Sequence, residues 1–506
     1  MKFKSIKSIS AAVMCSLMLF SACTDLTDGY STDPVNITDP SVITTDKFMS
    51  GTLANLIGIY EGDMNRLTGM WTGHFSGEDR QYVGLMNYGV SGRDFNTEWG
   101  GVYSAVIKNA HVVKSRSHLE NNKRMLAIAQ AAEAMAVGLA ADLWGDVPFT
   151  EMGQYPVITT PRYDEQTSVY NNVQVLLDSA ILNFNDADVP AKRLGEAELG
   201  DFFFGADAAS WIAVCNTLKA RFYLHVKDYD KALAAADLGV ITPEGNLMAP
   251  HGSSYLQNFN LFYSFTVYDR PGYMAANGYA AALMDPANPD GRNNSKTDES
   301  SRLNWFYQPA DGTYDLNYLV DFDWGIPTEY NGFFGASTSF PMVTWQENTL
   351  IRAEALAKKN NFDDALDALN ELRAFLDGGG DWSIGYQEDP DYNGGHAPED
   401  GPFSNYQPYV ATDFDAGEIE NVDGVTREEA LLREIIEERY VTLTGQLEVY
   451  NDIRRTNNFL GIPVKSGNNT IPLRLLYPQS EINTNPNIPT TGVGLFEATS
   501  ANKTPY

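Results

Sequence analysis

Apolar positions recur at helical spacing in several long segments of the chain. Residues 125–143 carry Met, Ile, Leu and Ala side chains at intervals of three and four, which predicts a helix with one buried face. A second helix is predicted from Thr426, because Thr426 and Glu429 have the spacing of a capping box and an apolar face follows them. The fold is therefore expected to be mostly α-helical.

Two segments, 218–237 and 351–370, repeat the same pattern of alanine, an aromatic residue nine positions later, and alanine three positions further on. The matching residues are Ala220, Tyr229 and Ala232 in one copy and Ala353, Phe362 and Ala365 in the other. This order is typical of tetratricopeptide helix pairs, in which small residues let two helices approach closely and the ring packs against the turn.

The predicted organisation after residue 22 is a single domain, 23–506, in which helix pairs alternate with loop-rich insertions. The helix pairs are expected at about 45–118, 125–184, 209–240 and 343–376 plus 425–456. The insertions, rich in Gly, Pro, Asn and aromatic residues, are expected at about 62–97, 241–342 and 377–424. Loops of this length are usually functional or mobile.

The first residues predict export. Three lysines precede an apolar run over residues 9–20, which is shorter than the roughly 20 apolar residues that span a bilayer. Small residues and then Cys23 follow, as at a signal-peptide cleavage site. The pattern resembles a bacterial lipobox, so residues 1–22 are predicted to be a lipoprotein signal peptide and Cys23 the lipidated residue. Phe20 fits a lipobox imperfectly, so an ordinary signal peptide stays open.

The chain is strongly acidic, with a formal net charge of −31 at pH 7. Loss of the signal peptide would remove three lysines and no acid. Such a surface repels phosphate backbones, so no nucleic-acid binding is expected. With Cys15 in the signal peptide and Cys23 lipidated, only Cys215 would remain, and no intrachain disulfide is expected.

Four motifs, in chain order, resemble those of the SusD/RagB family of Bacteroidetes outer-membrane lipoproteins, in particular its SusD-like subgroup. They are ADLWGDVPFTE (141–151), FPMVTWQENTLIRAEALAKK (340–359), LREIIEERYVTLTGQLEVYNDIRRTN (432–457) and IPLRLLYPQSEINTNPN (471–487). Each match is modest alone, but together they span nearly the whole mature chain.

The resemblance implies a fold in which four tetratricopeptide-like helix pairs support a large, irregular ligand-binding half. It also implies a nutrient-binding lipoprotein, anchored to the cell outer membrane and exposed at the surface. Such a protein captures oligosaccharides and delivers them to a SusC-like TonB-dependent transporter, for which it acts as a lid. The family does no chemistry on its ligand, so neither catalytic residues nor a cofactor is implied.

Sugar binding needs flat aromatic faces beside hydrogen-bonding side chains. Two stretches outside strong helical periodicity, 70–88 and 302–335, offer both. The candidate ligand-binding residues are Trp71, His74, Asp79, Arg80, Tyr82 and Tyr88 in the first stretch, and Trp305, Tyr307, Tyr318, Trp324 and Tyr330 in the second. Core packing is an equally good interpretation of each aromatic residue. Trp99 and Trp144 lie in predicted helices and are assigned to the core.

Catalysis finds little support in the sequence. A glycosidase needs two facing carboxylates, whereas Glu437 and Glu438 are adjacent on a helix and point in different directions. Surface charge, or pairing with Arg433 and Arg439, is the better explanation for them. Arg454 and Arg455 are interpreted as structural ion-pairing residues.

Metal sites are also weakly indicated. His111 and His118 are seven residues apart, whereas a helical metal pair is better served by a spacing of four. Residues 285–294 offer carboxylate and amide oxygens but lack the spacing of an EF-hand, so a turn is the better interpretation. A structural calcium ion stays open there and in the acidic stretch 377–424.

Three alternatives to oligosaccharide capture stay open. The same lid role for peptides would use the charges of Asp79 and Arg80. A glycan-cleaving enzyme would release reducing ends. A scaffold that binds only proteins would use the helix pairs, which is how tetratricopeptide frames usually act.

Overall fold

The computed structural model describes residues 43–154, 156–186, 200–252, 254, 257–310, 312–318, 332–382, 405–465 and 467–506. Three of the predicted functional residues, Cys23, Trp324 and Tyr330, lie outside these ranges.

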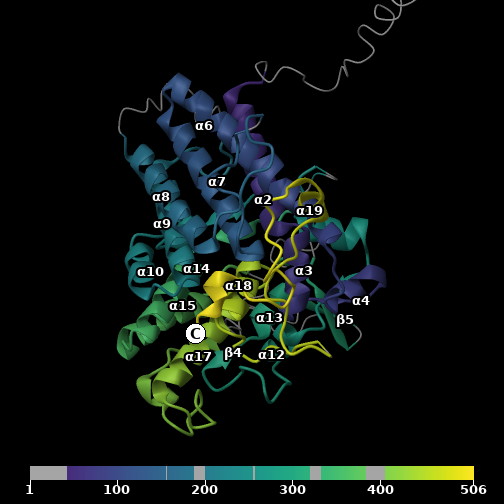
Figure 1. Cartoon of the computed structure of the whole chain (residues 1–506). Helices are drawn as coiled ribbons and strands as arrows, with labels where there is room; N and C mark the ends of the chain where they lie inside the picture. Colours follow the sequence, from purple (N-terminus) through teal and green to yellow (C-terminus); the bar gives the residue numbers. More distant parts are fainter. Residues whose placement is uncertain are drawn as a thin grey trace, which may run out of the picture.

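Long helices pack side by side in one curved layer (Figure 1), each contacting the next. In this order they are α2 (Thr45–Glu61), α6 (Lys108–Glu120), α7 (Lys123–Trp144), α8 (Gln166–Asn185), α9 (Ala208–His225), α10 (Tyr229–Ala236), α14 (Trp345–Lys358) and α15 (Phe362–Asp377). Two further helices, α17 (Arg427–Thr442) and α18 (Leu447–Arg455), pack against α14 and α9 respectively. The predicted fold class, mostly α with tetratricopeptide-like pairs, is confirmed.

The repeated alanines explain the close packing of the pairs α9–α10 and α14–α15. Ala220 and Ala353 are fully buried on the first helix of each pair. The aromatic positions, Tyr229 and Phe362, begin the second helices. The predicted cap of α17 is also present, because the Thr426 hydroxyl accepts a hydrogen bond from the Glu429 N–H at 3.2 Å.

Helix α7 lies at the centre of the layer. By length and composition it is the one helix among the described residues that is long and apolar enough to cross a membrane, but 94% of its apolar window is buried inside the protein. It is therefore a core helix. Trp144 at its end and Trp99 nearby are 0% and 6% exposed, which confirms their assignment to the core.

The segment 62–97, predicted to be a loop-rich insertion, is largely helical. Its elements and the helix that follows are α3 (Asp63–Thr72), β1 (Ser76–Gly77), α4 (Arg80–Met86), η2 (Gly92–Phe95) and α5 (Asn96–Gly100). A π-helical turn, η3 (Gly101–Ile107), joins α5 to α6. The prediction failed because these helices are short and rich in glycine, and burial against α18 and neighbouring segments supports them instead.

The rest of the molecule is built from short elements that emerge from the helical layer. The helical ones are η5 (Pro243–Gly245), α11 (Leu261–Tyr263), η6 (Ser264–Asp269), α12 (Tyr279–Met284), α13 (Ser300–Phe306), η9 (Ala411–Phe414), α19 (Gln479–Thr484) and η10 (Ser500–Lys503). The strands are β2 (Leu247–Ala249), β3 (Met274–Ala275), β4 (Thr297–Asp298), β5 (Tyr307–Ala310), β6 (Thr313–Leu316), β7 (Phe340–Val343) and β8 (Asn405–Tyr406). They pair as four antiparallel two-stranded ribbons: β1–β3, β2–β7, β4–β8 and β5–β6.

Buried ion pairs fasten the helices of the layer to one another. The Arg221 guanidinium on α9 donates two hydrogen bonds of 2.6 Å to Glu347 on α14. Arg455 on α18 donates to Glu354 on α14 at 2.5 and 2.6 Å. Arg455 is thus an ion-pairing residue, as predicted, whereas Arg454 donates to the Asp142 carbonyl oxygen at 2.8 Å and to other uncharged groups.

Candidate functional site

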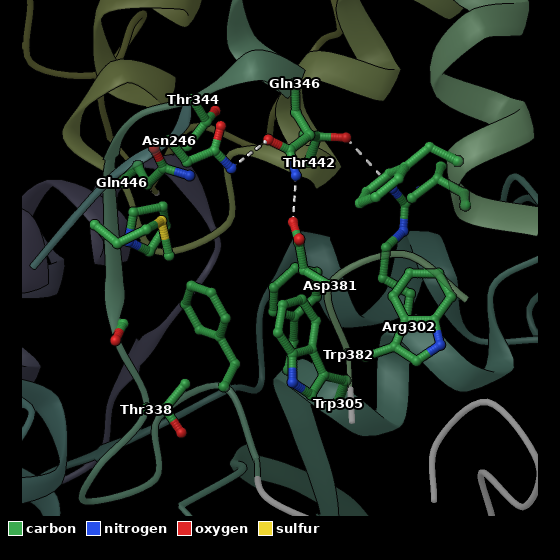
Figure 2. A pocket seen from close by; sticks show the side chains of 17 residues that line it. Asn246, Arg302, Trp305, Thr338, Thr344, Gln346, Asp381, Trp382, Thr442 and Gln446 are labelled. Atoms are coloured by element: carbon green, nitrogen blue, oxygen red, sulfur yellow. Dashed lines mark hydrogen bonds between the residues drawn. The ribbon is translucent and has the colours of Figure 1, made fainter. Parts of the chain in front are cut away.

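A cavity of about 260 Å³ opens where the loop-rich half meets the ends of α15 and α17 (Figure 2). Side chains from α13, the segment 333–341, the start of α14 and the residues after α15 form its walls. Aromatic and aliphatic side chains form most of its exposed surface, and the described lining residues also include amides, hydroxyls, the Arg302 guanidinium and one carboxylic acid. Pockets of this composition are typical of small-ligand sites.

Two tryptophans form the aromatic side of the pocket. Trp305, half-buried at the end of α13, and Trp382, 2% exposed, have ring centroids 6.2 Å apart and planes tilted by 57°. Trp305 is held in place by Phe333, whose ring meets it edge-on at 5.0 Å and whose N–H donates to the Trp305 carbonyl oxygen.

The three glycines after α15 place Trp382. Gly380 has a φ of +58°, and a Cβ atom there would come within 2.6 Å of the Trp382 ring. Only glycine allows both this backbone conformation and this close contact. The turn at residues 378–380 therefore ends the helix and brings the ring into the pocket wall.

Two amide side chains, Asn246 and Gln346, form a chain of hydrogen bonds that ends at the carboxyl group of Asp381. The Asn246 Nδ2 donates to Gln346 Oε1 at 3.1 Å, and Gln346 Nε2 donates in turn to Asp381 (Figure 2). Asp381 is exposed as a whole residue, but its carboxyl group points at Gln346 inside the pocket. Burial of this carboxyl group raises the pKa of Asp381 to about 6, so the group is ionised at neutral pH.

Arg302 lines the pocket, but its charge is already neutralised. Its guanidinium donates to Glu299 at 2.6 and 2.7 Å and to Glu438 at 2.7 Å. Burial alone would raise the pKa of Glu438, but Arg302 and Arg292 lower it to about 2. The sequence suggested that Glu437 and Glu438 pair with Arg433 and Arg439. This prediction is wrong.

The arginines of α17 instead find other carboxylates. Arg433 contacts Asp423 at 2.8 Å, and Arg439 contacts Asp452 at 2.9 Å. Residues adjacent on a helix point away from each other, so each charged side chain of this helix meets a different neighbouring segment.

Four of the predicted ligand-binding residues, Trp71, His74, Tyr307 and Tyr88, are core residues and not ligand contacts. Trp71, His74 and Tyr307 are 0%, 1% and 0% exposed. The Trp71 indole N–H donates to the Leu85 carbonyl oxygen at 2.8 Å, and burial lowers the pKa of His74 to about 3. These rings present no surface to a ligand.

Tyr88 belongs to the same core. It is 6% exposed, meets the Trp71 ring edge-on at 6.1 Å, and accepts a hydrogen bond from the Lys465 N–H at 3.2 Å. Tyr318 is half-buried against a small cluster that contains Phe259 and Tyr263.

Asp79, Arg80 and Tyr82 lie together on a separate surface at α4. Asp79 caps the helix by accepting from the Arg80 N–H at 2.9 Å. The Arg80 guanidinium lies 5.6 Å from the Tyr273 ring, which Tyr82 approaches at 5.9 Å. None of these three residues lines the pocket that contains Trp305.

The pocket therefore contains one residue proposed from the sequence, Trp305, and two that sequence reasoning missed, Asp381 and Trp382. Both follow the triple glycine at 378–380 within a stretch interpreted as an acidic loop. The glycines were the available signal, because three in a row at a predicted helix end indicate a tight turn that can set the next side chains against the core.

Metal binding finds no site in the described part of the chain, where no three His, Cys, Asp or Glu side chains are grouped to hold an ion. His111 instead contacts Glu133 at 2.9 Å. In the segment 285–294, Asp285 and Asn288 accept hydrogen bonds from nearby backbone N–H groups at 2.8 and 3.1 Å, as in a turn.

Residues 37–261 match a family model described as SusD-like, "starch-binding associating with outer membrane". The solved structures extend the likeness over most of the chain. Residues 37–261 therefore match the SusD-like family, and most of the chain has the fold of SusD homologues. No curated protein matches this chain at a significant level.

Three solved structures illustrate the shared fold. A SusD/RagB family protein of Bacteroides thetaiotaomicron is 23% identical, with a TM-score of 0.62 over 88% of this chain and 95% of that one. A SusD homologue of Bacteroides fragilis is 15% identical, with a TM-score of 0.65 over 91% and 99%. A chitin-binding SusD homologue of Flavobacterium johnsoniae is 16% identical, with a TM-score of 0.60 over 90% and 99%.

Proposed function

We propose that this protein captures oligosaccharides at the outer surface of the cell and passes them to a partner TonB-dependent transporter, for which it acts as a lid. Cys23 would carry the lipid that anchors it to the outer membrane. The family description supports an association with starch and the outer membrane, and a chitin-binding relative has the same fold.

The observation that carries the proposal is that Trp305, which packs against the buried Trp382, lies in one small pocket with the carboxyl group of Asp381. Tryptophan rings cover the C–H face of a sugar, while carboxylates and amides meet its hydroxyl groups. Among the described lining residues Asp381 is the one carboxylic acid. A glycosidase needs two, so the pocket is suited to binding rather than hydrolysis.

Peptides fit the pocket less fully than sugars. The N-terminal ammonium group of a peptide could pair with Asp381, but the C-terminal carboxylate would need a free cation. The lining cation, Arg302, is bonded to Glu299 and Glu438. Peptide capture is therefore an outcome of the test rather than a second proposal.

The first prediction tests the pocket directly. A glycan array followed by calorimetry with the mature protein should identify a ligand, and Trp305→Ala should weaken it at least tenfold, about 1.4 kcal/mol. Trp305→Phe keeps an aromatic face and should retain most of the affinity. Circular dichroism checks that both variants fold. Equal affinity in Trp305→Ala and the unaltered protein would refute the site, and binding of peptides alone would refute the ligand class.

A further inference from the structure

The size of the pocket limits how much of a glycan it holds. At about 260 Å³ it lies just below the range of roughly 300–1,000 Å³ that is typical of pockets for drug-sized ligands. Met248, Gln346, Trp305 and Trp382 line it from different elements, and one side stays open. A single sugar ring fits such a volume, whereas several rings in a row need an open groove.

The geometry of the two tryptophans agrees with a single ring. Successive sugars along a chain stack on aromatic rings that share one plane. Trp305 and Trp382 are tilted by 57°, with centroids 6.2 Å apart. They do not form a shared platform. Trp382 is 2% exposed and packs behind Trp305, so Trp305 alone offers an open face, and one face stacks one ring.

The polar end of the pocket determines which ring is accepted. An ionised carboxylate accepts hydrogen bonds from hydroxyl or ammonium groups but donates none. Asp381 is held by Gln346, and the guanidinium of Arg302 is bonded to Glu299 and Glu438. An acidic sugar would therefore bring a second negative charge beside Asp381. None of the described lining residues offers a free cation to neutralise it.

We propose that the pocket binds the terminal ring of a glycan chain, end on, and that Asp381 selects an uncharged or amine-bearing ring over an acidic one. This inference rests on the proposed function. Like charges in a partly buried site repel each other strongly because water screens them poorly, which gives Asp381 its selectivity.

An array of glycans with defined ends and linkages tests the end-on binding. Bound glycans should share a terminal ring, whatever the linkages behind it, and methylation of the hydroxyl groups of that ring should abolish binding. Lengthening the bound glycan beyond three rings should change its affinity, measured by calorimetry, less than threefold. Binding of glycans that share an internal sequence but differ in their terminal rings would overturn the inference and leave the proposed function standing. Binding to no glycan would overturn both.

Asp381→Asn tests the selectivity at pH 7.5. The bound glycan is compared with a counterpart whose terminal ring carries a carboxylate at C6. The variant should bind the acidic form at least tenfold more tightly than the unaltered protein does. Glu371→Gln removes the same charge on the exposed side of α15, where Glu371 pairs with Arg352 at 3.3 Å, and should change nothing. Equal discrimination in Asp381→Asn and the unaltered protein would overturn the role of Asp381.

Discussion

His225 shows how single side chains hold the helical layer together. Its two ring nitrogens lie 2.7 Å from Asp142 and 2.5 Å from Glu448, so one buried imidazole joins helices α7, α9 and α18. Burial alone would lower the pKa of His225, but the two carboxylates override it and raise the pKa to about 10. The imidazolium is therefore charged at neutral pH.

His225 should make the stability of the protein depend on pH. Its folded pKa lies above the ordinary value of about 6.5, so its contribution is complete below that value and disappears as pH rises towards 10. His225→Gln removes the cation between two buried carboxylates, Asp142 and Glu448, and should cost about 3–5 kcal/mol at pH 7. Urea denaturation at pH 7 and pH 10 measures this.

The exposed His118→Gln is the control for His225→Gln and should leave stability unchanged. The difference in unfolding free energy between the unaltered protein and His225→Gln should shrink between pH 7 and pH 10. A difference that stays constant over this range would mean that the ring is not charged in the folded protein.

Single aromatic residues show the limit of prediction from sequence. Trp71 and Trp305 both lie on short helices within polar, glycine-containing stretches, and both fitted a sugar site. Trp71 packs between Tyr88 and Tyr450 in the core, whereas Trp305 faces a cavity. The difference depends on segments such as α18 that are distant in sequence, and local pattern does not contain it.

At the scale of elements, the packing of α7 against α9 depends on one glycine. A Cβ atom on Gly138 of α7 would lie 2.2 Å from the ring of Phe222 on α9, which is 1% exposed. The ring has no free space into which to move. Gly138 therefore sets the distance between the two helices.

Gly138→Ala should destabilise the protein, because overpacking of about 1–3 kcal/mol exceeds the gain of about 0.8–1 kcal/mol in helix propensity. Gly58→Ala is the matched control. Gly58 also lies inside a helix, α2, but a Cβ atom there meets nothing within 4 Å, so this variant should be more stable. Thermal denaturation measures both, and a higher melting temperature in Gly138→Ala would refute the close contact.

Long elements could be predicted from the sequence and short ones could not. The helices α7, α14 and α17 have apolar stripes and caps that a single sequence displays. The ribbon β2–β7 joins Leu247 to Val343, and its strands are too short to carry a periodic pattern. Much of the loop-rich half is supported by such contacts between distant residues, so its organisation follows from tertiary packing rather than from local propensity.

At the scale of the whole molecule, the candidate pocket lies at the edge of the ion-paired helical layer, where Arg302 pairs with Glu438 of α17. Pairs such as Arg221–Glu347 and Arg455–Glu354 are buried within the layer, whereas the pocket uses Trp305, Asp381 and residues near the ends of helices. A rigid frame with binding groups at its edge allows the groups to change without loss of the fold. The motifs that resemble the family lie largely in the frame, which explains why they indicate the family but not the sugar.

The last prediction concerns the lipid anchor proposed at Cys23, on which the role as a tethered receptor depends. If Cys23 is lipidated, the chain should fractionate with the outer membrane, because each buried CH₂ group of an acyl chain contributes about 0.8 kcal/mol to membrane binding. Cys23→Ala should remove the acyl mass from the N-terminal peptide and release the mature protein from the membrane, with unchanged glycan affinity. Cys15→Ala, within the predicted signal peptide, is the matched control and should stay membrane-bound. Membrane attachment of Cys23→Ala after cleavage of its signal peptide would show that something other than the lipid holds the protein there.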